Sequence, residues 1–314
     1  MRVTALAGGI GAGKFLRGLV RVVQPADVTV VVNTGDDIEM HGFHVSPDLD
    51  SVTYWLAGTM DRERGWGRRD ETFRATGELG RFDPSQAWFN LGDLDLATHL
   101  YRTNLLRAGA TLSDASALIA RRFGVGSRIM PMSDDPVATR VTVVADGEQL
   151  DLHFQEYWVK RRARDEVKAI RYQGVEAARP TPGVLEAIEA ADVVVLCPSN
   201  PIASLRPILS VPGIGKTVAG RRDATVGISP IVGGAPLAGM ADRLMPVAGY
   251  AVTALGAAEC YRGLLGGWVV DNADRDLAPT IERELGARVA VTDTVMADDP
   301  KAENVARVAL DLVR

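Results

Sequence analysis

The chain has 314 residues, of which 46% are hydrophobic, enough to bury the core of a large α/β domain. Its 40 acidic residues exceed its 35 basic ones, and the formal net charge of -5 excludes a sequence-wide basic surface for nucleic acid. No apolar stretch reaches the length of a signal segment or a membrane span, so we expect a cytoplasmic protein with small-molecule ligands and no membrane partner.

A βαβ unit opens the chain. Residues 2–7 have the pattern of a buried strand, apolar residues from Phe15 to Val23 recur at helical spacing, and residues 28–33 have the pattern of a second strand. Such a unit requires a parallel sheet with right-handed crossovers, which brings ligand groups to the carboxyl ends of the strands. The loops that follow strands are therefore the first places in which to look for a site.

The rest of the chain continues the α/β alternation after a helical interruption. Strand patterns are scarce between residues 51 and 124, where 94–108 and 112–123 have helical spacing. A β-hairpin is expected at 141–145 and 150–154, and such a pair could form the edge of the sheet. Strands are expected at 192–196, 224–228, 268–270 and 289–292, and helices at 182–190, 257–265 and 301–313. This order predicts a single Rossmann-like domain over residues 1–314, a three-layer α/β fold with a mainly parallel sheet and an inserted helical subdomain at about 51–124.

The turn after the first strand, GGIGAGK, comes close to two phosphate-binding motifs. It matches the GxxxxGK of a P-loop but has Phe15 where a magnesium-binding Ser or Thr should follow, which disfavours a nucleoside triphosphatase. It also fails as a dinucleotide fingerprint, because Lys14 stands where the third glycine should be. A small-residue turn between a strand and a helix still favours phosphate at the helix N-terminus over a purely structural turn.

Four aspartates follow the second strand. Asp36 and Asp37 come directly after NTG, and Asp48 and Asp50 follow Ser46 and a proline at the start of a helical pattern. Any one of them could simply cap that helix or be solvated. Hard oxygen ligands beside a phosphate site suit Mg²⁺, so the group predicts a magnesium site.

Three further loops carry polar residues. The string LGDLDLATH adds Asp93 and Asp95 at a loop-to-helix junction, where either could be a helix cap. After the strand at 192–196 comes CPSNP, which places Ser199 and Asn200 at the carboxyl edge of the sheet, and ISPIVGG places Ser229 at the next such edge. Together these loops predict a nucleotide pocket.

Taken in chain order, the strings GGIGAGK, VNTGDD, SPDLD, GWG, LGDLDLATH, PMSDDP, FQEYWVKRR, PSNP, SPIVGG and GMADR resemble the 2-phospho-L-lactate transferase family. The resemblance extends from Met1 to the DTVM string at 293–296. It implies a Rossmann-like homodimer of deazaflavin coenzyme (F-420) assembly. Such an enzyme uses Mg²⁺ and a guanosine-diphospho-linked lactyl or enolpyruvyl acid to modify the deazaflavin Fo, releasing GMP. One departure is AGMADR at 238–243, where many members have GPAD preceded by a basic residue.

The resemblance also implies roles for individual residues. The expected phosphate and nucleotide contacts are Gly9, Gly11, Lys14, Asp36, Asp37, Ser199, Asn200 and Ser229, with the guanine at Ser199 and Asn200. The expected magnesium ligands are Asp50 and Asp48, and Asp36 and Asp37 are further candidates. The catalytic candidates are Asp50 and Asp95, and Asp50 could be the base instead of a magnesium ligand. The candidates for Fo binding are Trp66, Trp88 and Asp93, although the two tryptophans could instead belong to the core.

Two other functions remain for comparison. A related branch with a similar glycine turn consists of regulatory nucleotide-sugar-binding proteins. The complete SPDLD and LGDLD strings argue against placing this chain in that branch. An NAD-dependent oxidoreductase is disfavoured by the failed fingerprint and by the lack of a lone acidic residue at the end of the second strand.

Overall fold

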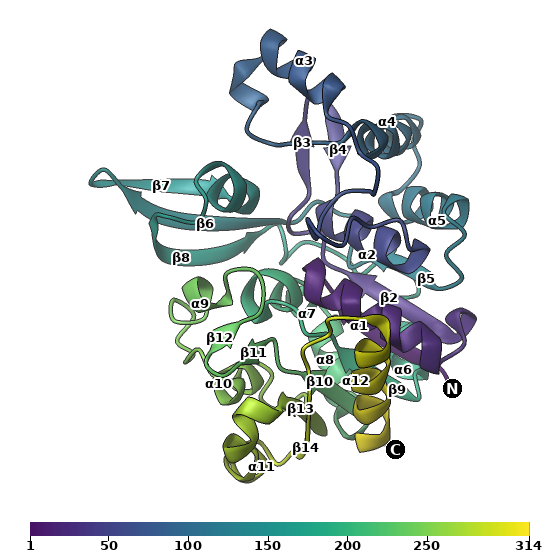
Figure 1. Cartoon of the computed structure of the whole chain (residues 1–314), viewed down its shortest axis with the longest axis vertical. Helices are drawn as coiled ribbons and strands as arrows, with labels where there is room; N and C mark the ends of the chain where they lie inside the picture. The colour runs from purple at the N-terminus through teal and green to yellow at the C-terminus, as the bar shows by residue number, and fades with distance from the viewer. Residues whose placement is uncertain (314) are drawn as a thin grey trace.

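The fold is built on a sheet of seven parallel strands. The computed structural model describes residues 1–313 (Figure 1). From one edge to the other the strands are β5 (Arg128–Pro131), β2 (Val28–Val32), β1 (Val3–Ala7), β9 (Val193–Leu196), β10 (Thr225–Ile228), β13 (Gly267–Asp271) and β14 (Arg288–Thr292). The sheet therefore grows outward from β1 in one direction and from β9 in the other, as in a doubly wound Rossmann fold. The point where the direction changes lies between β1 and β9, which pair in parallel.

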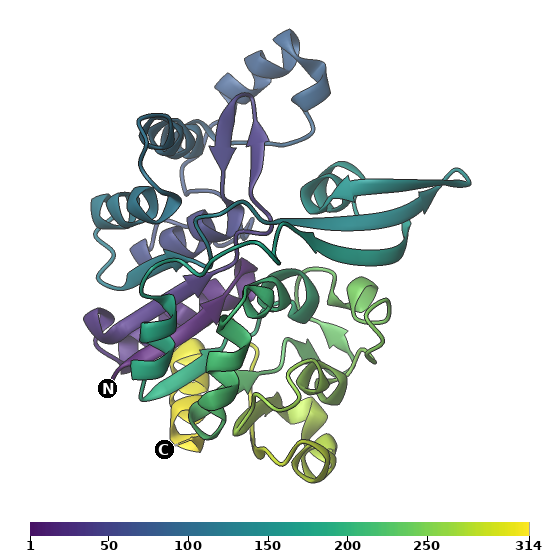
Figure 2. The ribbon, with the colours of Figure 1, turned by 180° about the vertical axis from the view of Figure 1, so that it is seen from behind.

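Helices cover both faces of this sheet, so the expected three-layer α/β fold is confirmed. One face packs against α1 (Gly9–Val22), α2 (Pro47–Ala57), α5 (Leu112–Arg122) and α12 (Asp299–Leu312). The other packs against α6 (Val184–Ala190), α7 (Arg206–Ser210), α8 (Ile214–Gly220), α10 (Ala254–Glu259) and α11 (Ala278–Leu285), best seen in Figure 2. Because successive strand residues point to opposite faces, Ala5 faces the first layer and Leu6 the second. Double-sided burial explains why these strands are continuous apolar runs in the sequence.

The segment between β2 and β5 rises above the sheet as a hairpin followed by helices. It contains β3 (Ile38–Met40), β4 (Phe43–Val45), α2, α3 (Arg74–Phe82), the short turn η2 (Pro84–Gln86), α4 (Asp93–Arg107) and α5. The helices expected at 94–108 and 112–123 are present as α4 and α5, each shifted by about one residue. Thr111 begins α5 with a capping box, since its hydroxyl accepts from the Asp114 N–H and the Asp114 carboxylate accepts from the Thr111 N–H.

The hairpin expected at the edge of the main sheet is wrong in its placement. Strands β6 (Ala138–Ala145) and β7 (Glu148–His153) do pair, but they join β8 (Glu166–Gln173) in a separate antiparallel sheet. This sheet projects sideways from the body as an arm (Figures 1 and 2). Its inner side chains, Val141 and Val143, belong to the same core as one face of the main sheet, which is a tertiary contact that the local pattern does not encode. The sequence pattern also missed β8 and β5.

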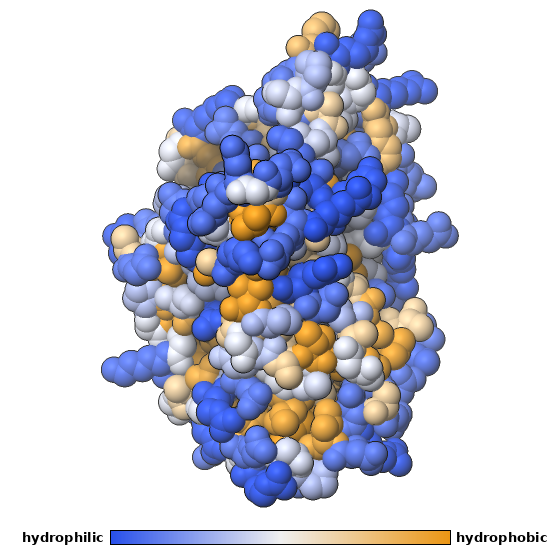
Figure 3. Space-filling model, turned by 90° about the vertical axis from the view of Figure 1, so that its left-hand side faces the viewer, coloured by the Kyte–Doolittle hydropathy of each residue, from blue (hydrophilic) through white to orange (hydrophobic). Residues whose placement is uncertain are grey.

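The C-terminal half continues the alternation with shorter elements. Between β10 and β13 lie a two-stranded hairpin of β11 (Ile231–Val232) and β12 (Ala235–Pro236), then α9 (Ala241–Leu244) and α10. The helix expected at 257–265 is α10, which begins and ends earlier than predicted. Figure 3 views the molecule toward the free end of the arm and shows apolar groups gathered mainly in its lower half. Among the described residues, every helix is too short or too polar to span a bilayer.

Candidate functional site

The glycine turn lies where the sheet changes direction. Gly8 follows β1 and precedes α1, and Gly9 begins the helix with a φ of 71°, a conformation that favours glycine. The Gly9 N–H donates to Asp48 Oδ1 at 2.7 Å, and the Gly8 N–H donates to Ser199 Oγ at 3.3 Å. A Cβ atom at Gly8 would lie 2.5 Å from Asp48 Oδ2, so this position has no room for a larger residue. The turn thus brings together the loops after β1, β2 and β9.

The remaining residues of the turn leave backbone donors available. The N–H groups of Ile10 and Gly11 have no acceptor within the described residues, as expected for the first turn of a helix. Gly11 packs closely on the loop after β9, since an added Cβ would lie 2.1 Å from the Pro198 carbonyl oxygen. Lys14 is half-buried on the next turn of α1. Unpaired N–H groups at the positive end of a 14-residue helix form a site for an anion.

A buried amide holds two of the acidic side chains against this turn. Asn33 Nδ2 donates to Asp48 Oδ2 at 2.9 Å and to Asp36 Oδ1 at 3.2 Å. From the arm, Gln155 Nε2 donates to Asp36 Oδ2 at 3.4 Å. Asp36 and Asp48 are each only 5% exposed, and within residues 1–313 no salt bridge reaches either of them. The two carboxylates therefore share hydrogen bonds but have no cationic partner.

Burial without a cation makes both groups resist ionisation. Burial raises the pKa of Asp48 to about 6, against the hydrogen bonds from Asn33 and Gly9. Burial, and next the charge of Asp48, hold the pKa of Asp36 well above its ordinary range. Burial also raises the pKa of Asp37, although His44 Nε2 lies 3.0 Å from its carboxylate and Ser46 donates to it at 2.7 Å. A bound cation would relieve this concentration of negative charge.

A second buried cluster joins α2 to α4. Arg102, 1% exposed, donates two hydrogen bonds to Asp50, one of them from Nη1 to Oδ2 at 3.0 Å. His99 lies between two carboxylates, with Nδ1 3.5 Å from Asp50 Oδ2 and Nε2 3.5 Å from Asp95 Oδ1. Tyr54 donates its hydroxyl to Asp95 Oδ1 at 2.6 Å. Burial alone would raise the pKa of Asp95, but His99, Tyr54 and Arg102 together hold it below its ordinary value.

Both clusters have a chemistry that fits a divalent cation. One ligand atom from each of Asp50, Asp95 and His99 lies within 4.8 Å of the others, a spacing compatible with a single metal ion. In this cluster Arg102 already compensates one carboxylate, whereas Asp36 and Asp48 have only neutral hydrogen-bond donors. Oxygen-only ligands beside a phosphate site suit Mg²⁺ better than a mixed set that includes imidazole.

Asn200, Ser199 and Ser229, three of the residues expected at the nucleotide, make hydrogen bonds to backbone groups of the protein. Asn200 Oδ1 accepts from the N–H groups of Ile202 and Ala203 and so caps the π-helical turn η4 (Pro201–Leu205). Ser199 accepts from Gly8, as described above. Ser229 donates to the Ile231 carbonyl at 2.8 Å and accepts from the Ile231 N–H at 3.2 Å. The Asn200 Nδ2 group has no partner within the described residues and remains a donor for a ligand.

The three residues expected at Fo lie in separate environments of the helical segment. Trp66, 38% exposed, packs edge-on against Phe73. Trp88 packs against Phe89 and lies under Lys160, which belongs to the π-helical turn η3 (Glu156–Lys160) of the arm. Asp93 accepts from Thr72, Arg74 and Ala75 and so caps the start of α3 instead of its own helix. No contact in the described structure joins the two tryptophans and Asp93.

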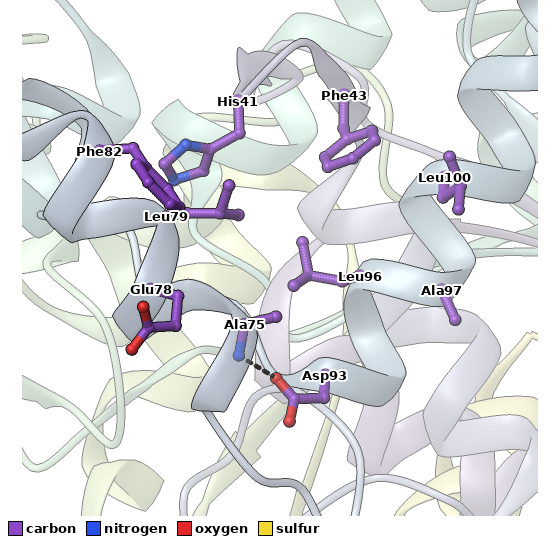
Figure 4. Close-up of a pocket in the computed structure, with 10 residues that line it drawn as sticks. All are labelled: His41, Phe43, Ala75, Glu78, Leu79, Phe82, Asp93, Leu96, Ala97 and Leu100. Carbon is purple, nitrogen blue, oxygen red and sulfur yellow. Dashed lines mark hydrogen bonds between the residues drawn. The ribbon is translucent and has the colours of Figure 1, made fainter.

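A cavity of about 560 Å³ lies between α3, α4 and the β3–β4 hairpin (Figure 4). Leu79, Leu96 and Leu100 give it an apolar lining, and Asp93 lies at one end, where it accepts from Ala75. None of its lining residues comes from the glycine turn or from the loops after β9 and β10. This cavity is therefore separate from the anion site.

Several residues at these clusters escaped the sequence analysis. They are Asn33, Tyr54, Arg102, Gln155 and Ser204. Asn33 stands in the VNTGDD string and Gln155 in FQEYWVKRR, so the motifs pointed to their neighbourhoods. Arg102 and Tyr54 had no such signal, because an arginine or tyrosine on a helix is usually partly exposed.

The chain was compared with known families, proteins and structures. The family model described as 2-phospho-L-lactate transferase CofD matches residues 3–312. Proteins named phosphoenolpyruvate transferase are similar over 99% of this chain and 98% of their own length, at 48% identity in Streptomyces griseus and 42% in Thermobifida fusca. The same name is carried by a protein of Mycolicibacterium smegmatis with 40% identity over 99% of this chain and 98% of its own length.

Solved structures with the same fold are more distant in sequence. A crystal structure of a member of the UPF0052 family from Bacillus halodurans covers 98% of this chain and 98% of its own, with 16% identity and a TM-score of 0.62. A second structure of the Bacillus halodurans protein gives 18% identity and a TM-score of 0.64, covering 98% of this chain and 99% of its own. These similarities concern the fold alone.

Proposed function

Because the chain belongs to the 2-phospho-L-lactate transferase family and is a transferase enzyme, we propose that it transfers a phospho-acid to Fo, 7,8-didemethyl-8-hydroxy-5-deazariboflavin. The donor is a guanosine-diphospho-linked acid, and GMP is released. The observation that carries the proposal is the full-length similarity to proteins named phosphoenolpyruvate transferase. The same similarity favours an enolpyruvyl donor over a lactyl one.

The anion site supports a diphosphate-linked donor. The unpaired N–H groups of Ile10 and Gly11 and the dipole of α1 favour a phosphate group at the turn. Lys14 adds a positive charge on the same helix, and Asn200 offers its Nδ2 donor to the guanine from the neighbouring loop. Because the turn and this loop meet where the sheet changes direction, one nucleotide can contact both.

The transfer exchanges one phosphorus–oxygen bond for another. The terminal ribityl hydroxyl of Fo attacks the phosphorus next to the acid, the bond from that phosphorus to the GMP oxygen breaks, and the hydroxyl proton passes to a carboxylate. Asp50 and Asp95 are the candidates to accept it, and Arg102 fixes the orientation of Asp50 through two hydrogen bonds. Positioning and charge neutralisation supply most of the catalysis in phosphoryl chemistry of this kind.

Mg²⁺ is the proposed cofactor. Asp48 and Asp50 are its first candidate ligands, with Asp36 and Asp37 as alternatives. The buried carboxylates of Asp48 and Asp36, which have no cationic partner among the described residues, support these two, whereas Asp50 is already paired with Arg102. When bound, such an ion neutralises charge on the phosphate oxygens of the donor. The homodimer and the cytoplasmic location implied by the family resemblance remain part of the same proposal.

The proposal is tested by incubating purified protein with Fo, Mg²⁺ and either guanosine-diphospho-enolpyruvate or guanosine-diphospho-lactate. Chromatography with fluorescence detection follows a charged Fo product, and GMP is quantified in the same samples. We expect product with the enolpyruvyl donor, and none from an Asp50→Asn variant. The exposed Asp223, before β10 at the opposite edge of the sheet, provides the matched control Asp223→Asn, which should retain activity. GDP binding without product from either donor would instead favour a regulatory nucleotide-binding protein.

A further inference from the structure

Ser204 lies against the glycine turn although 195 residues separate it from Gly9 in the sequence. A Cβ atom at Gly8 would lie 2.7 Å from Ser204 Cβ and 3.1 Å from its Oγ, and one at Gly9 would lie 4.0 Å from that Oγ. The side chain belongs to the π-helical turn η4, which Asn200 caps and which Asn33 holds by donating to the Ala203 carbonyl at 3.4 Å. Ser204 therefore has a fixed position beside the start of α1.

The hydroxyl of Ser204 donates to and accepts from no described residue, and although the residue is only 7% exposed, its oxygen is not among the fully enclosed unpaired atoms and is therefore open to a ligand. A hydroxyl group can donate one hydrogen bond, and this one has no protein acceptor to compete with a ligand. Its nearest surroundings are the turn in which the N–H groups of Ile10 and Gly11 are also unpaired. Donors from two distant segments thus converge on one place, and an anion is the ligand that would satisfy them all.

The sequence of the turn gives this convergence a specific meaning. In a P-loop the Ser or Thr that follows the lysine binds Mg²⁺, and here that position is Phe15, fully buried in the core, so the glycine turn has no hydroxyl of its own there. Ser204 provides a hydroxyl at the same turn from the loop after β9. The loop after β9 reaches the glycine turn because β1 and β9 are neighbours in the sheet.

We propose that Ser204 is a ligand-binding residue that donates its hydroxyl to a phosphate group of a nucleoside diphosphate at the N-terminus of α1. This assignment rests on the proposed function for the nature of the nucleotide. It predicts that Ser204 contributes to binding of the phosphates and contributes nothing to binding of the guanosine part. It also predicts that removing the hydroxyl leaves the ligand-free fold intact, because no protein group loses a partner.

The test compares Ser204→Ala with the wild type and with Ser210→Ala, which removes an exposed hydroxyl at the end of α7. Isothermal titration calorimetry measures binding of GDP and of guanosine in the presence of Mg²⁺, and thermal unfolding is followed with and without GDP. A lost hydrogen bond to a charged group should weaken GDP binding by about tenfold or more. Guanosine binding and the Tm of the ligand-free protein should stay unchanged, while the rise in Tm caused by GDP becomes smaller.

Several results would overturn the assignment. They are an unchanged GDP affinity, an equal loss of guanosine and GDP affinity, a lower Tm of the ligand-free variant, or a wild type that does not bind GDP. The proposed function fails independently, if the wild type binds GDP through Ser204 yet forms no product from either donor. Conversely, product formation by the wild type together with an unchanged GDP affinity of Ser204→Ala would reject only the role of Ser204.

Discussion

Replacing Asp48 by asparagine should change how the stability of the metal-free protein depends on pH. Burial raises the pKa of Asp48 from 3.8 to about 6, so the folded state binds the proton more tightly than the unfolded state does. The sign follows directly, because a raised carboxyl pKa stabilises the fold below about pH 4 and loses that stabilisation as the pH rises through about 6. A shift of about two units corresponds to about 3 kcal/mol of unfolding free energy.

The expected signal is that the unfolding free energy of the wild type and that of Asp48→Asn depend differently on pH. Asparagine at position 48 does not titrate, so the wild type should lose about 2 kcal/mol relative to the variant between about pH 4.5 and about pH 8. The variant also places an amide near the Asn33 Nδ2 donor, 2.9 Å from Asp48 Oδ2 in the wild type, but this cost does not depend on pH. The comparison therefore reports the ionisation of Asp48 together with its effect on Asp36, whose pKa the charge of Asp48 raises.

Urea unfolding across this pH range, with a chelator present, measures both free energies. The exposed Asp223 again gives a control, since Asp223→Asn should run parallel to the wild type at every pH. A stability difference between Asp48→Asn and the wild type that is constant with pH would refute the reasoning. Adding Mg²⁺ near neutral pH should then stabilise the wild type more than the variant, if Asp48 is one of the ligands.

Three further predictions concern other parts of the molecule. Replacing Arg102 by methionine should lower the unfolding free energy by about 3–5 kcal/mol in urea titrations, because Asp50 is left as an uncompensated buried charge; a loss below about 1 kcal/mol would contradict this. Gly18→Ala should destabilise the protein by about 1–3 kcal/mol, since the added Cβ would lie 2.2 Å from the Ala302 carbonyl carbon of α12. As a control, Gly77→Ala on α3 would place its Cβ more than 4 Å from any described atom outside that helix and should be neutral or stabilising. Chelation of divalent ions should abolish GMP release in the transfer assay and Mg²⁺ should restore it; full activity in excess chelator would reject the magnesium requirement.

Local patterns were sufficient for most of the parallel sheet. Strands β1, β2 and β9 are short apolar runs between turn residues, and such runs occur because both faces of the sheet are covered. The pattern missed β5 because its four residues include an exposed arginine and a terminal proline. It misplaced the β6–β7 hairpin because an alternating pattern predicts a strand but does not say which sheet the strand joins.

The candidate site was predicted in outline by the same route. Loops after parallel strands meet at one edge, so the glycine turn, Asp48 and Ser199 could be grouped before any contact was known. The sequence could not predict which carboxylate is paired with a basic side chain. Asp50 is paired with Arg102, 52 residues away, whereas Asp48 has no cationic partner in the described part of the chain. The difference depends on how α4 packs over α2, and no local pattern in the sequence records that packing.

The sequence by itself determined most strands of the parallel sheet, the glycine turn and the family, because these depend on residue type and on spacing along the chain. The tertiary structure alone decided the contacts that join distant segments. It placed Gln155 of the arm on Asp36, the unpaired hydroxyl of Ser204 beside Gly8, and a buried arginine on Asp50. Each depends on side chains brought together by packing of separate layers, where burial and the low local dielectric, and not residue type, set the strength and the consequence of an interaction.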